Sequence, residues 1–464
     1  MSFLLDIDTQ TVYQIQNIYI HFWEWFMLFI LFIAFTLITH RKKQLRIERE
    51  PEYKYYVWGF YAKFFGVIFF LLIYYYFYNG GDTLRYFESS MSMANLFYKN
   101  PSSYFSVLFS PPTEEARSYF DFYTGFPYEY IFEDTKTYLV VKLISPLTII
   151  TGKSYLITSV LISYFTYQGI WKLYQLFYRY YPKLHFQLAI AILFLPSAIF
   201  WGSGVLKDSF TLMGTCIFTY QMHEIFILKK HKVNNYISLT IFSLIILGIK
   251  PYIFMLLFPG ALFWIFYERI SKFRKSSIAF LFIPIIIIFI GVFSVLFFSM
   301  LGDSLDKFSV EKALNTASVT QNDLKQEYYE GKSFDIGNFD GTPSSALRLF
   351  PAATIAGMIR PFLWEADSPF MILSAMENIL IIYLIFKLIL LYKPKRILSI
   401  IYNNPLPMFC MLFSLLFSFM LGITTSNYGA LMRFKIPMLP FLISGLYILN
   451  YLAKNQKQKE YLKS

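Results

Sequence analysis

A carboxylate beside a predicted membrane surface is the first feature of this chain that could do chemistry. The stretch 79–88 reads NGGDTLRYFE and follows a long apolar segment. Its two glycines favour the end of a helix, and one turn of a following helix would present Asp82, Arg85 and Tyr86 together. Asp82 could then act as a general base for a hydroxyl group, with Arg85 orienting that group or binding phosphate. The alternative is an Asp82 that caps a helix and makes a local ion pair without any chemistry.

Cations stand beside several predicted helix starts. Residues 194–210 read FLPSAIFWGSGVLKDSF, in which Pro and Gly loosen the end of one helix before Lys207-Asp208 begins the next. Further starts are expected at Lys250-Pro251, Asp367–Pro369 and Arg433–Pro437. A helix N-terminus with an adjacent cation binds anions, so these ends would hold phosphate or pyrophosphate if the fold brings them together. Without convergence each cation contacts lipid headgroups separately, and Lys207 simply extends toward them.

The turn near the C-terminus is a further candidate. Asn427-Tyr-Gly429 is typical of a tight turn, and Arg433 follows on the first turn of the next helix, with Lys435 two residues later. The planar guanidinium fork of Arg433 suits phosphate or carboxylate. The alternative for this arginine is an interfacial anchor that holds the helix at the membrane surface.

Residues 345–364 are apolar but shorter than a full span. They predict a re-entrant or interface-lying helix with Arg348 and Arg360 at its two ends. Backbone of this kind is tolerated at membrane depth where it lines a cavity. The alternative is an amphipathic interfacial helix that binds no ligand.

The composition places all of these residues in a membrane protein. Of 464 residues, 56% are hydrophobic and 15% are charged, whereas a soluble protein carries about 25% charged residues. A membrane-spanning helix needs roughly 20 mostly apolar residues. About eleven segments meet this requirement, and residues 137–151 could form a twelfth span or a re-entrant hairpin. The eleven run near 18–39, 56–78, 154–174, 187–206, 209–228, 236–250, 252–268, 278–300, 369–392, 405–425 and 436–453.

The charges of the connecting loops predict the orientation. Short basic loops hold more than half of the 41 Lys and Arg residues, and all of them fall on one side of an eleven-helix count. The positive-inside rule places that side in the cytoplasm, which puts the N-terminus outside and the C-terminus inside. Two long loops, 79–137 and 301–367, then lie on the outer face. We therefore expect one all-α transmembrane domain over residues 1–464.

Several function classes lack support in the sequence. The five histidines show no zinc-ligand spacing, and the two cysteines lie in apolar runs where they cannot build a disulfide framework. No GxxxxGK[ST], GxSxG or GxGxxG motif occurs. The net charge of +12 could indicate nucleic acid, but most positive charges serve membrane orientation, so no nucleic-acid partner is expected.

Four motifs together resemble bacterial multi-pass proteins of surface-polysaccharide synthesis. These are the O-antigen and exopolysaccharide polymerase-like families and the membrane glycosyltransferases with the GT-C fold. The resemblance covers most of the chain in topology and, in detail, only the motifs GGDTLRYFE, LPSAIFWGSGVLKDSF, MIRPFLWE and NYGALMRFKIPMLPF.

The resemblance implies roles for particular residues. GT-C enzymes place an essential acidic residue in the first outer loop, and Asp82 is the matching position. They use polyprenyl-phosphate-linked sugars, and the counterparts of their phosphate-binding residues would be Lys207, Arg360 and Arg433. GT-C proteins often carry a DxD or ExD pair in that loop, whereas Asp82 has no acidic neighbour closer than Glu88. No cofactor is expected, and dependence on a divalent metal is left open.

Residues and resemblance together predict a GT-C-like glycosyltransferase or polysaccharide polymerase in the bacterial inner membrane. It would transfer sugar or glycan from a polyprenyl (pyro)phosphate-linked donor to an acceptor hydroxyl on the outer face, alone or with partners of a polysaccharide assembly machinery. The expected catalytic residues are Asp82, Arg85 and Arg433. The expected substrate- and phosphate-binding residues are Tyr86, Glu88, Lys207, Asp208, Lys250, Arg348, Arg360, Asn427 and Lys435.

Two other classes compete with the enzyme. A flippase or transporter of the same lipid-linked glycan also needs basic residues, but it needs no base and should carry cations deep in its spans. A non-catalytic subunit of an envelope complex would tolerate the loss of these side chains. The unpaired charges predicted here gather at one face, which favours the enzyme.

Overall fold

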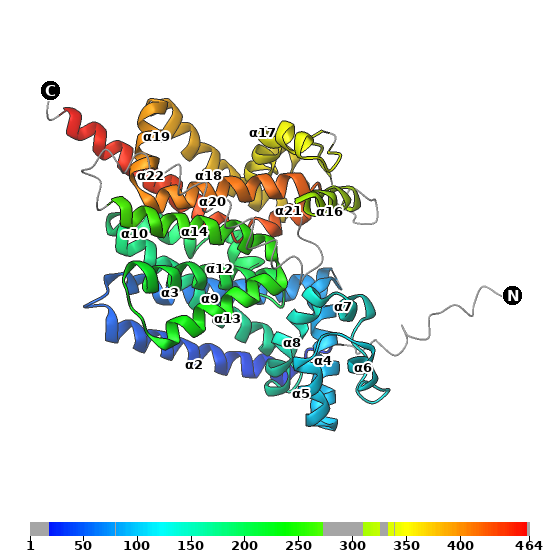
Figure 1. The fold of residues 1–464 in the computed structure, drawn as a ribbon. Coiled ribbons are helices and arrows are strands. Elements are labelled where there is room, and N and C mark those ends of the chain that lie inside the picture. Colours follow the sequence, from blue (N-terminus) through cyan, green and yellow to red (C-terminus); the bar gives the residue numbers. More distant parts are fainter. Residues whose placement is uncertain (1–17, 79, 272–309, 325–332, 338, 462–464) are drawn as a thin grey trace. The chain divides into compact units, whose positions relative to one another are not determined.

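Every element in the described residues is a helix (Figure 1), which confirms the all-α prediction. The computed structural model describes residues 18–78, 80–271, 310–324, 333–337 and 339–461. The chain divides into two compact units. Unit 1 comprises residues 1–171, 198–214 and 244–251, and unit 2 comprises residues 172–197, 215–243 and 252–464.

Unit 1 contains the N-terminal helices. They are α2 (Phe22–Arg46), η1 (Pro51–Tyr55), α3 (Tyr56–Leu72), the π-helical η2 (Ile73–Phe77), α4 (Asp82–Lys99), α5 (Pro101–Phe109), α6 (Glu114–Ser118), α7 (Glu129–Glu133) and α8 (Thr135–Ile150). Five helices contain a boundary between the units or adjoin one. They are α9 (Tyr155–Tyr180), α11 (Pro196–Phe200), α12 (Lys207–Met222), α13 (Val233–Ile249) and α14 (Pro251–Ser271).

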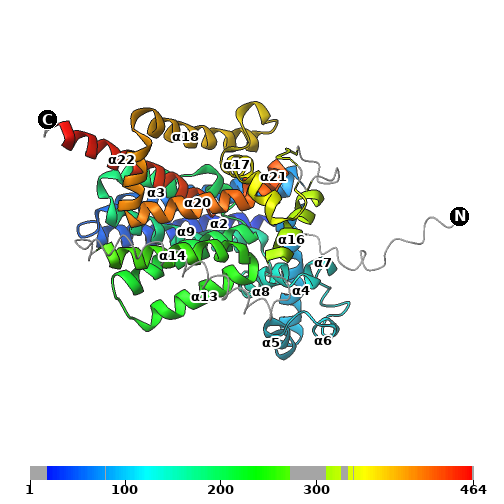
Figure 2. The same ribbon diagram turned by 45° about the horizontal axis from the view of Figure 1, so that its top comes forward.

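The remaining helices belong to unit 2. They are η3 (Pro182–Leu184), α10 (His185–Ile192), the π-helical η4 (His223–Ile227), α16 (Val310–Asp323), α17 (Pro343–Ile359), η6 (Leu363–Glu365), α18 (Pro369–Leu391), α19 (Pro394–Asn403), α20 (Pro405–Thr424), α21 (Tyr428–Phe434) and α22 (Leu439–Tyr461). Within this unit α20 packs against α17 and α22, and α22 also contacts α18 (Figure 2).

Four to six candidate membrane spans occur among the described residues. The four long apolar helices are Phe22–Arg46, Pro51–Phe77, Pro369–Leu391 and Pro405–Thr424. Two bent pairs, α8 with α9 and α21 with α22, raise the number to six if each pair counts as one span; their bends are 115° and 67°. The stretches Val233–Ile249 and Pro251–Tyr267 of α13 and α14 are apolar but shorter, and the expected span 278–300 lies outside the described residues.

The expected span 187–206 is broken. Helix α10 ends at Ile192 and the short α11 begins at Pro196, so no single helix covers the segment. Pro196 lacks the amide proton that would continue the hydrogen-bond ladder of α10, and its ring disfavours helical backbone at the preceding residue. This break places irregular backbone among apolar helices, where its polar groups need partners from other parts of the chain.

The first predicted outer loop is folded, with α4 to α7 spanning residues 82–133. Figures 1 and 2 both show α4, α5 and α8 close together. Buried hydroxyl pairs join these elements: Thr83 to Tyr155 at 2.8 Å, Ser90 to Thr148 at 2.9 Å and Tyr104 to Ser145 at 3.0 Å. Each pair satisfies two hydroxyls that would otherwise be buried without partners, so α4 is held firmly along α8 and the start of α9.

Small residues set the distance between α17 and α20. Ala353 and Gly357 on α17, and Ser418 and Gly422 on α20, repeat the small-xxx-small spacing that lets helices approach closely in membranes. A Cβ added to Gly422 would lie 1.8 Å from the carbonyl oxygen of Ala353, and one added to Gly357 would lie 1.9 Å from that of Ser418. Helix α17, part of the segment predicted to be re-entrant or interface-lying, is thus packed against a candidate span.

Replacing Gly422 with valine should loosen this contact. The new side chain would overlap the α17 backbone, and overpacking of this kind costs typically about 1–3 kcal/mol of stability. We expect a lower midpoint of thermal unfolding for the purified protein. Gly80→Ala is the matched control, because its new Cβ would have only the Tyr78 carbonyl oxygen near it, at 3.8 Å. Equal midpoints for the two variants would contradict the close α17–α20 packing.

Candidate functional site

Asp82 is the first residue of α4 and is half-buried. The residue before it, Gly81, has φ of 93°, a conformation that favours glycine and turns the chain sharply into the helix. Asp82 lies within electrostatic reach of both Arg85 and Lys207. The predicted grouping of Asp82 with Arg85 therefore extends to a second cation that comes from α12.

Two tyrosines of the first outer loop flank Arg85. The exposed Arg85 donates to the Tyr130 hydroxyl at 3.3 Å, and its guanidinium lies 5.9 Å from the ring centroids of both Tyr128 and Tyr130. Tyr128 in turn donates to a carboxylate oxygen of Glu88 at 2.6 Å. Burial raises the pKa of Glu88, although the Tyr128 hydrogen bond and the charge of Arg85 oppose this rise. Carboxylates, a guanidinium and aromatic rings thus share one surface.

The remaining predicted member of α4, Tyr86, is buried at 5% exposure. It forms part of the packed side of the helix, while Asp82, Arg85 and Glu88 are less buried. Helical spacing correctly predicts that Tyr86 and Asp82 lie on one helix. In the structure, however, the Tyr86 ring is packed inside the protein.

Lys207 bridges to the start of α8. Its ammonium donates to Thr137 Oγ1 at 2.5 Å and lies 3.3 Å from a carboxylate oxygen of Asp134. Burial lowers the pKa of Lys207, and the negative charge of Asp134 partly opposes the change. Asp134 was not among the predicted site residues. Its position just before an apolar helix marks it only as an N-cap.

Asp208 and Lys250 form a buried ion pair at 2.6 Å. The Asp208 side chain is fully buried, and that of Lys250 is 8% exposed. Both were expected to bind substrate. Here each neutralises the other, and the pair joins the start of α12 to the break between α13 and α14. A buried pair of this kind is expensive to disrupt on one side, which suits it to fixing the position of neighbouring Lys207.

Lys63, a cation in the middle of α3, holds the broken segment after α11. The Lys63 ammonium donates to the carbonyls of Ala198 and Gly202, at 2.9 and 2.6 Å, and to Ser203 Oγ at 2.9 Å. These acceptors lie where α11 ends and its carbonyls lack helical partners. Close contact between Gly204 and the Phe70 ring packs the same turn on α3, because a Cβ at Gly204 would lie 2.0 Å from that ring. The only sequence signal for Lys63 is a charge inside an apolar run.

In unit 2, Arg360 is the C-cap of α17 and lies between aromatic rings. Its guanidinium is 5.1 Å from the centroid of Phe334 and 6.0 Å from that of Phe362, and its Nε lies 3.6 Å from Glu365. Tyr428 lies within hydrogen-bonding reach of both Arg360 and Glu365. Arg360 is 27% exposed, so the guanidinium is oriented by its neighbours but still reached by solvent.

Lys435 is buried and donates to Arg360. Its ammonium gives one hydrogen bond to the Arg360 carbonyl at 2.6 Å and another to Asn378 Oδ1 at 3.0 Å. The amide of Asn378 donates to the next carbonyl, that of Pro361, at 2.8 Å. Both carbonyls at the end of α17 are therefore paired with side chains from other helices. Lys435, which was expected to bind phosphate, donates its hydrogen bonds to a backbone carbonyl and to Asn378.

Glu377 supplies the acidic partner of this buried network. It accepts hydrogen bonds from the amide and the hydroxyl of Ser197, at 2.8 and 2.5 Å, at the start of α11. It also lies within electrostatic reach of Lys435. Glu377 and Asn378 are adjacent polar residues in the middle of a mostly apolar span, and this pairing is the sequence signal that could have revealed them.

The other predicted site residues of unit 2 lie on α17 and at α21. Asn427 caps α21, accepting from the Ala430 amide at 3.1 Å, and is 5% exposed. Arg348 is exposed on α17, and Arg433 is half-buried. Among the described residues, no three His, Cys, Asp or Glu side chains group so as to hold a metal ion.

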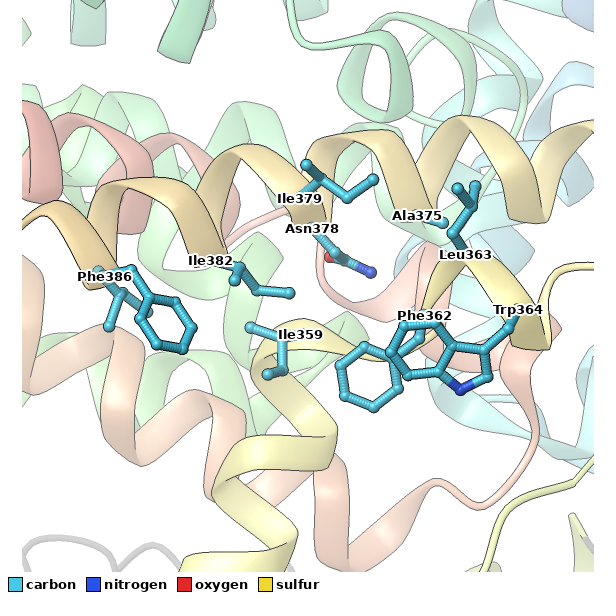
Figure 3. A pocket seen from close by; sticks show the side chains of 10 residues that line it. Ile359, Phe362, Leu363, Trp364, Ala375, Asn378, Ile379, Ile382 and Phe386 are labelled. Carbon is cyan, nitrogen blue, oxygen red and sulfur yellow. The ribbon is translucent and has the colours of Figure 1, made fainter.

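An apolar cavity of about 500 Å³ lies beside the Arg360–Pro361 peptide. Figure 3 shows side chains entering it from α18 on one side and from the end of α17 and the following turn on the other. Helix α18 contributes Ala375, Asn378, Ile379, Ile382, Ile385 and Phe386, and the opposite wall consists of Ile359, Phe362, Leu363 and Trp364. Since the Asn378 amide is already paired with Pro361 and Lys435, the lining is effectively hydrocarbon.

Substitutions at the buried ion pair of unit 1 test its structural role. Asp208→Asn or Lys250→Met alone should cost roughly 3–5 kcal/mol, because each leaves one charge buried without its main partner. The double variant should lose less stability than the sum of the losses measured for the two single variants. Thermal unfolding of the purified proteins measures this coupling. The exposed pair Lys99–Asp121 is the control and should show little effect when disrupted. Strict additivity at Asp208 and Lys250 would contradict direct pairing.

Comparison with known protein families, with curated proteins and with solved structures finds no match for this chain. The resemblance of the four sequence motifs to surface-polysaccharide enzymes therefore stays a prediction. The described part of the chain is an all-helical assembly with long apolar helices that fit a membrane protein.

Proposed function

We propose that this chain is a membrane glycosyltransferase or polysaccharide polymerase that uses a polyprenyl (pyro)phosphate-linked donor on the outer face of the bacterial inner membrane. The proposal includes the eleven-span topology, a GT-C-like bundle and the orientation with the N-terminus outside. The cluster around Asp82 carries it. A half-buried carboxylate there stands within electrostatic reach of Arg85 and Lys207, next to Tyr128 and Tyr130.

Each part of this cluster has a task in glycosyl transfer. Asp82 would take the proton of the acceptor hydroxyl as its oxygen bonds to the anomeric carbon. The bond between that carbon and the phosphate oxygen breaks at the same time, and its electron pair leaves with the phosphate. Lys207 and Arg85 would stabilise the negative charge that develops there. The exposed tyrosine Tyr130 and the neighbouring Tyr128 offer ring faces and hydroxyls to a sugar.

The electrostatics of the cluster support this assignment. Lys207 contacts Asp134 and Thr137 directly, and Asp82 lies within electrostatic reach of the same ammonium group. The cation that would receive the leaving phosphate is therefore held in place by a second carboxylate, that of Asp134. The cations of unit 2 that the sequence proposes for the donor, Arg360 and Arg433, are a separate part of the same proposal.

Asp82→Asn tests the proposed base. Asparagine keeps the shape of the side chain but cannot take a proton, so we expect surface glycan to stop at single lipid-linked units or to shorten strongly. General acid–base groups typically contribute about 10²–10⁴-fold to rate. The measurement is glycan length in cells that depend on the variant, together with the abundance of the protein in the membrane.

The matched control is Asp121→Asn, an exposed carboxylate of the same loop that pairs with Lys99. This variant should give glycan of normal length. Normal glycan from Asp82→Asn at normal abundance would rule out Asp82 as the base.

A further inference from the structure

The groove along α18 has the shape and lining of a binding site for a single hydrocarbon chain. Its α18 residues follow the spacing i, i+3, i+4, i+7, i+10 and i+11, from Ala375 to Phe386, which is one continuous face of a helix. At 1.5 Å per residue this face is about 16 Å long. The volume of about 500 Å³ is within the range of ligand sites, roughly 300–1,000 Å³.

The surroundings of the groove are those of a lipid-exposed surface. Helix α18 is one of the four candidate spans. Its outer side carries exposed apolar or aromatic side chains, including Ile372, Met376, Tyr383 and Leu391. A ligand that fills the groove can therefore enter sideways from the hydrocarbon region.

A cation stands at one end of the groove. Phe362 lines the cavity and also stacks on Trp364, at 4.8 Å between ring centroids, and the Arg360 guanidinium lies 6.0 Å from the centroid of the Phe362 ring. Trp364 is 82% exposed, as expected for an aromatic residue at a membrane interface. A guanidinium has five N–H donors, and the contacts of Arg360 with Glu365 and Tyr428 leave capacity for a phosphate oxygen.

Hydrogen bonds to the backbone of residues 360–362 fix the position of Arg360. Lys435 and Asn378 hold the carbonyls of Arg360 and Pro361, while Glu365 accepts from the Phe362 amide at 2.8 Å. The backbone that carries the cation also forms the wall of the groove. Charge and cavity are thus placed by the same residues.

We propose that this groove binds the hydrocarbon chain of a lipid-linked phosphate, with the phosphate on Arg360. The chain lies along α18 between Ile382 and Ile359, and the head group stays at the Trp364 end. This assignment rests on the proposed function for the identity of the ligand as the carrier lipid of the donor. It adds the place in the fold where the carrier is held.

Binding of a long-chain polyprenyl phosphate to the purified full-length protein tests the proposal. Ile382→Trp fills the groove and should lower affinity for the probe at least about tenfold, equivalent to 1.4 kcal/mol. Leu391→Trp places the same ring on the opposite, exposed face of α18, nine residues from Ile382, and should bind as wild type. Arg360→Ala should lower affinity for the phosphate but not for the corresponding polyprenol, and the exposed Lys395→Ala should change neither.

A measurement on wild-type protein guards against variants that misfold. A polyprenyl phosphate carrying a photoreactive group in its chain should crosslink to peptides within residues 375–386, and excess unlabelled probe should prevent this. Crosslinks confined to other helices would overturn the proposal. So would equal losses of affinity in Ile382→Trp and Leu391→Trp, or equal effects of Arg360→Ala on phosphate and polyprenol.

These readouts separate the groove from the enzyme. Probe binding that depends on Ile382 and Arg360, in a protein that makes no glycosidic bond, would support the groove and reject the proposed function. Normal glycan synthesis by Ile382→Trp, with unchanged probe binding, would reject the groove and leave the function standing.

Discussion

Backbone polar groups in an apolar surrounding need hydrogen-bond partners, and the arrangement of this protein depends on how its broken helices find them. A continuous helix satisfies its own backbone, but each break leaves carbonyls and amides without partners. Here buried charged and amide side chains fill those places. Lys63 pairs the carbonyls after α11, Glu377 pairs the amide at its start, and Lys435 pairs the carbonyl at the end of α17.

This use of buried charge separates positioning residues from residues that can meet a ligand. Lys435, Asp208 and Lys250 are buried and engaged with the protein itself. Asp82, Arg85, Lys207 and Arg360 are half-buried or exposed, and carboxylates hold Lys207 and Arg360 in place. The chemistry proposed for each unit therefore lies at its less buried cations and carboxylates. The buried charged residues hold the neighbouring backbone and side chains in place.

Much of the helical arrangement was predictable because apolar runs of sufficient length form helices in a membrane protein. The positions of α18 and α20 follow closely from composition, whereas α2 continues to Arg46, seven residues beyond the expected span 18–39; the grouping of Asp82 with Arg85 follows from helical spacing. The break within 187–206 is marked by Pro196 but was expected to lie near the end of a span.

Tertiary pairing could not be predicted: that Lys63 reaches residues 198–203, or that Lys435 reaches Arg360, depends on which helices pack together. The groove was also not predictable, because apolar side chains occur all around α18 and periodicity cannot distinguish a lining face from a lipid-facing one. The eleven-span count and the orientation remain predictions.

The most direct test of the central claim is the fate of a polyprenyl-pyrophosphate-linked oligosaccharide supplied to the wild-type protein reconstituted in liposomes. Mass spectrometry of the glycan and a leaflet-selective probe for the lipid would report both chemistry and movement. We predict new glycosidic bonds, with glycan chains longer than the supplied unit and release of the free carrier lipid. Unaltered donor that has moved to the opposite leaflet would contradict this claim and identify a flippase.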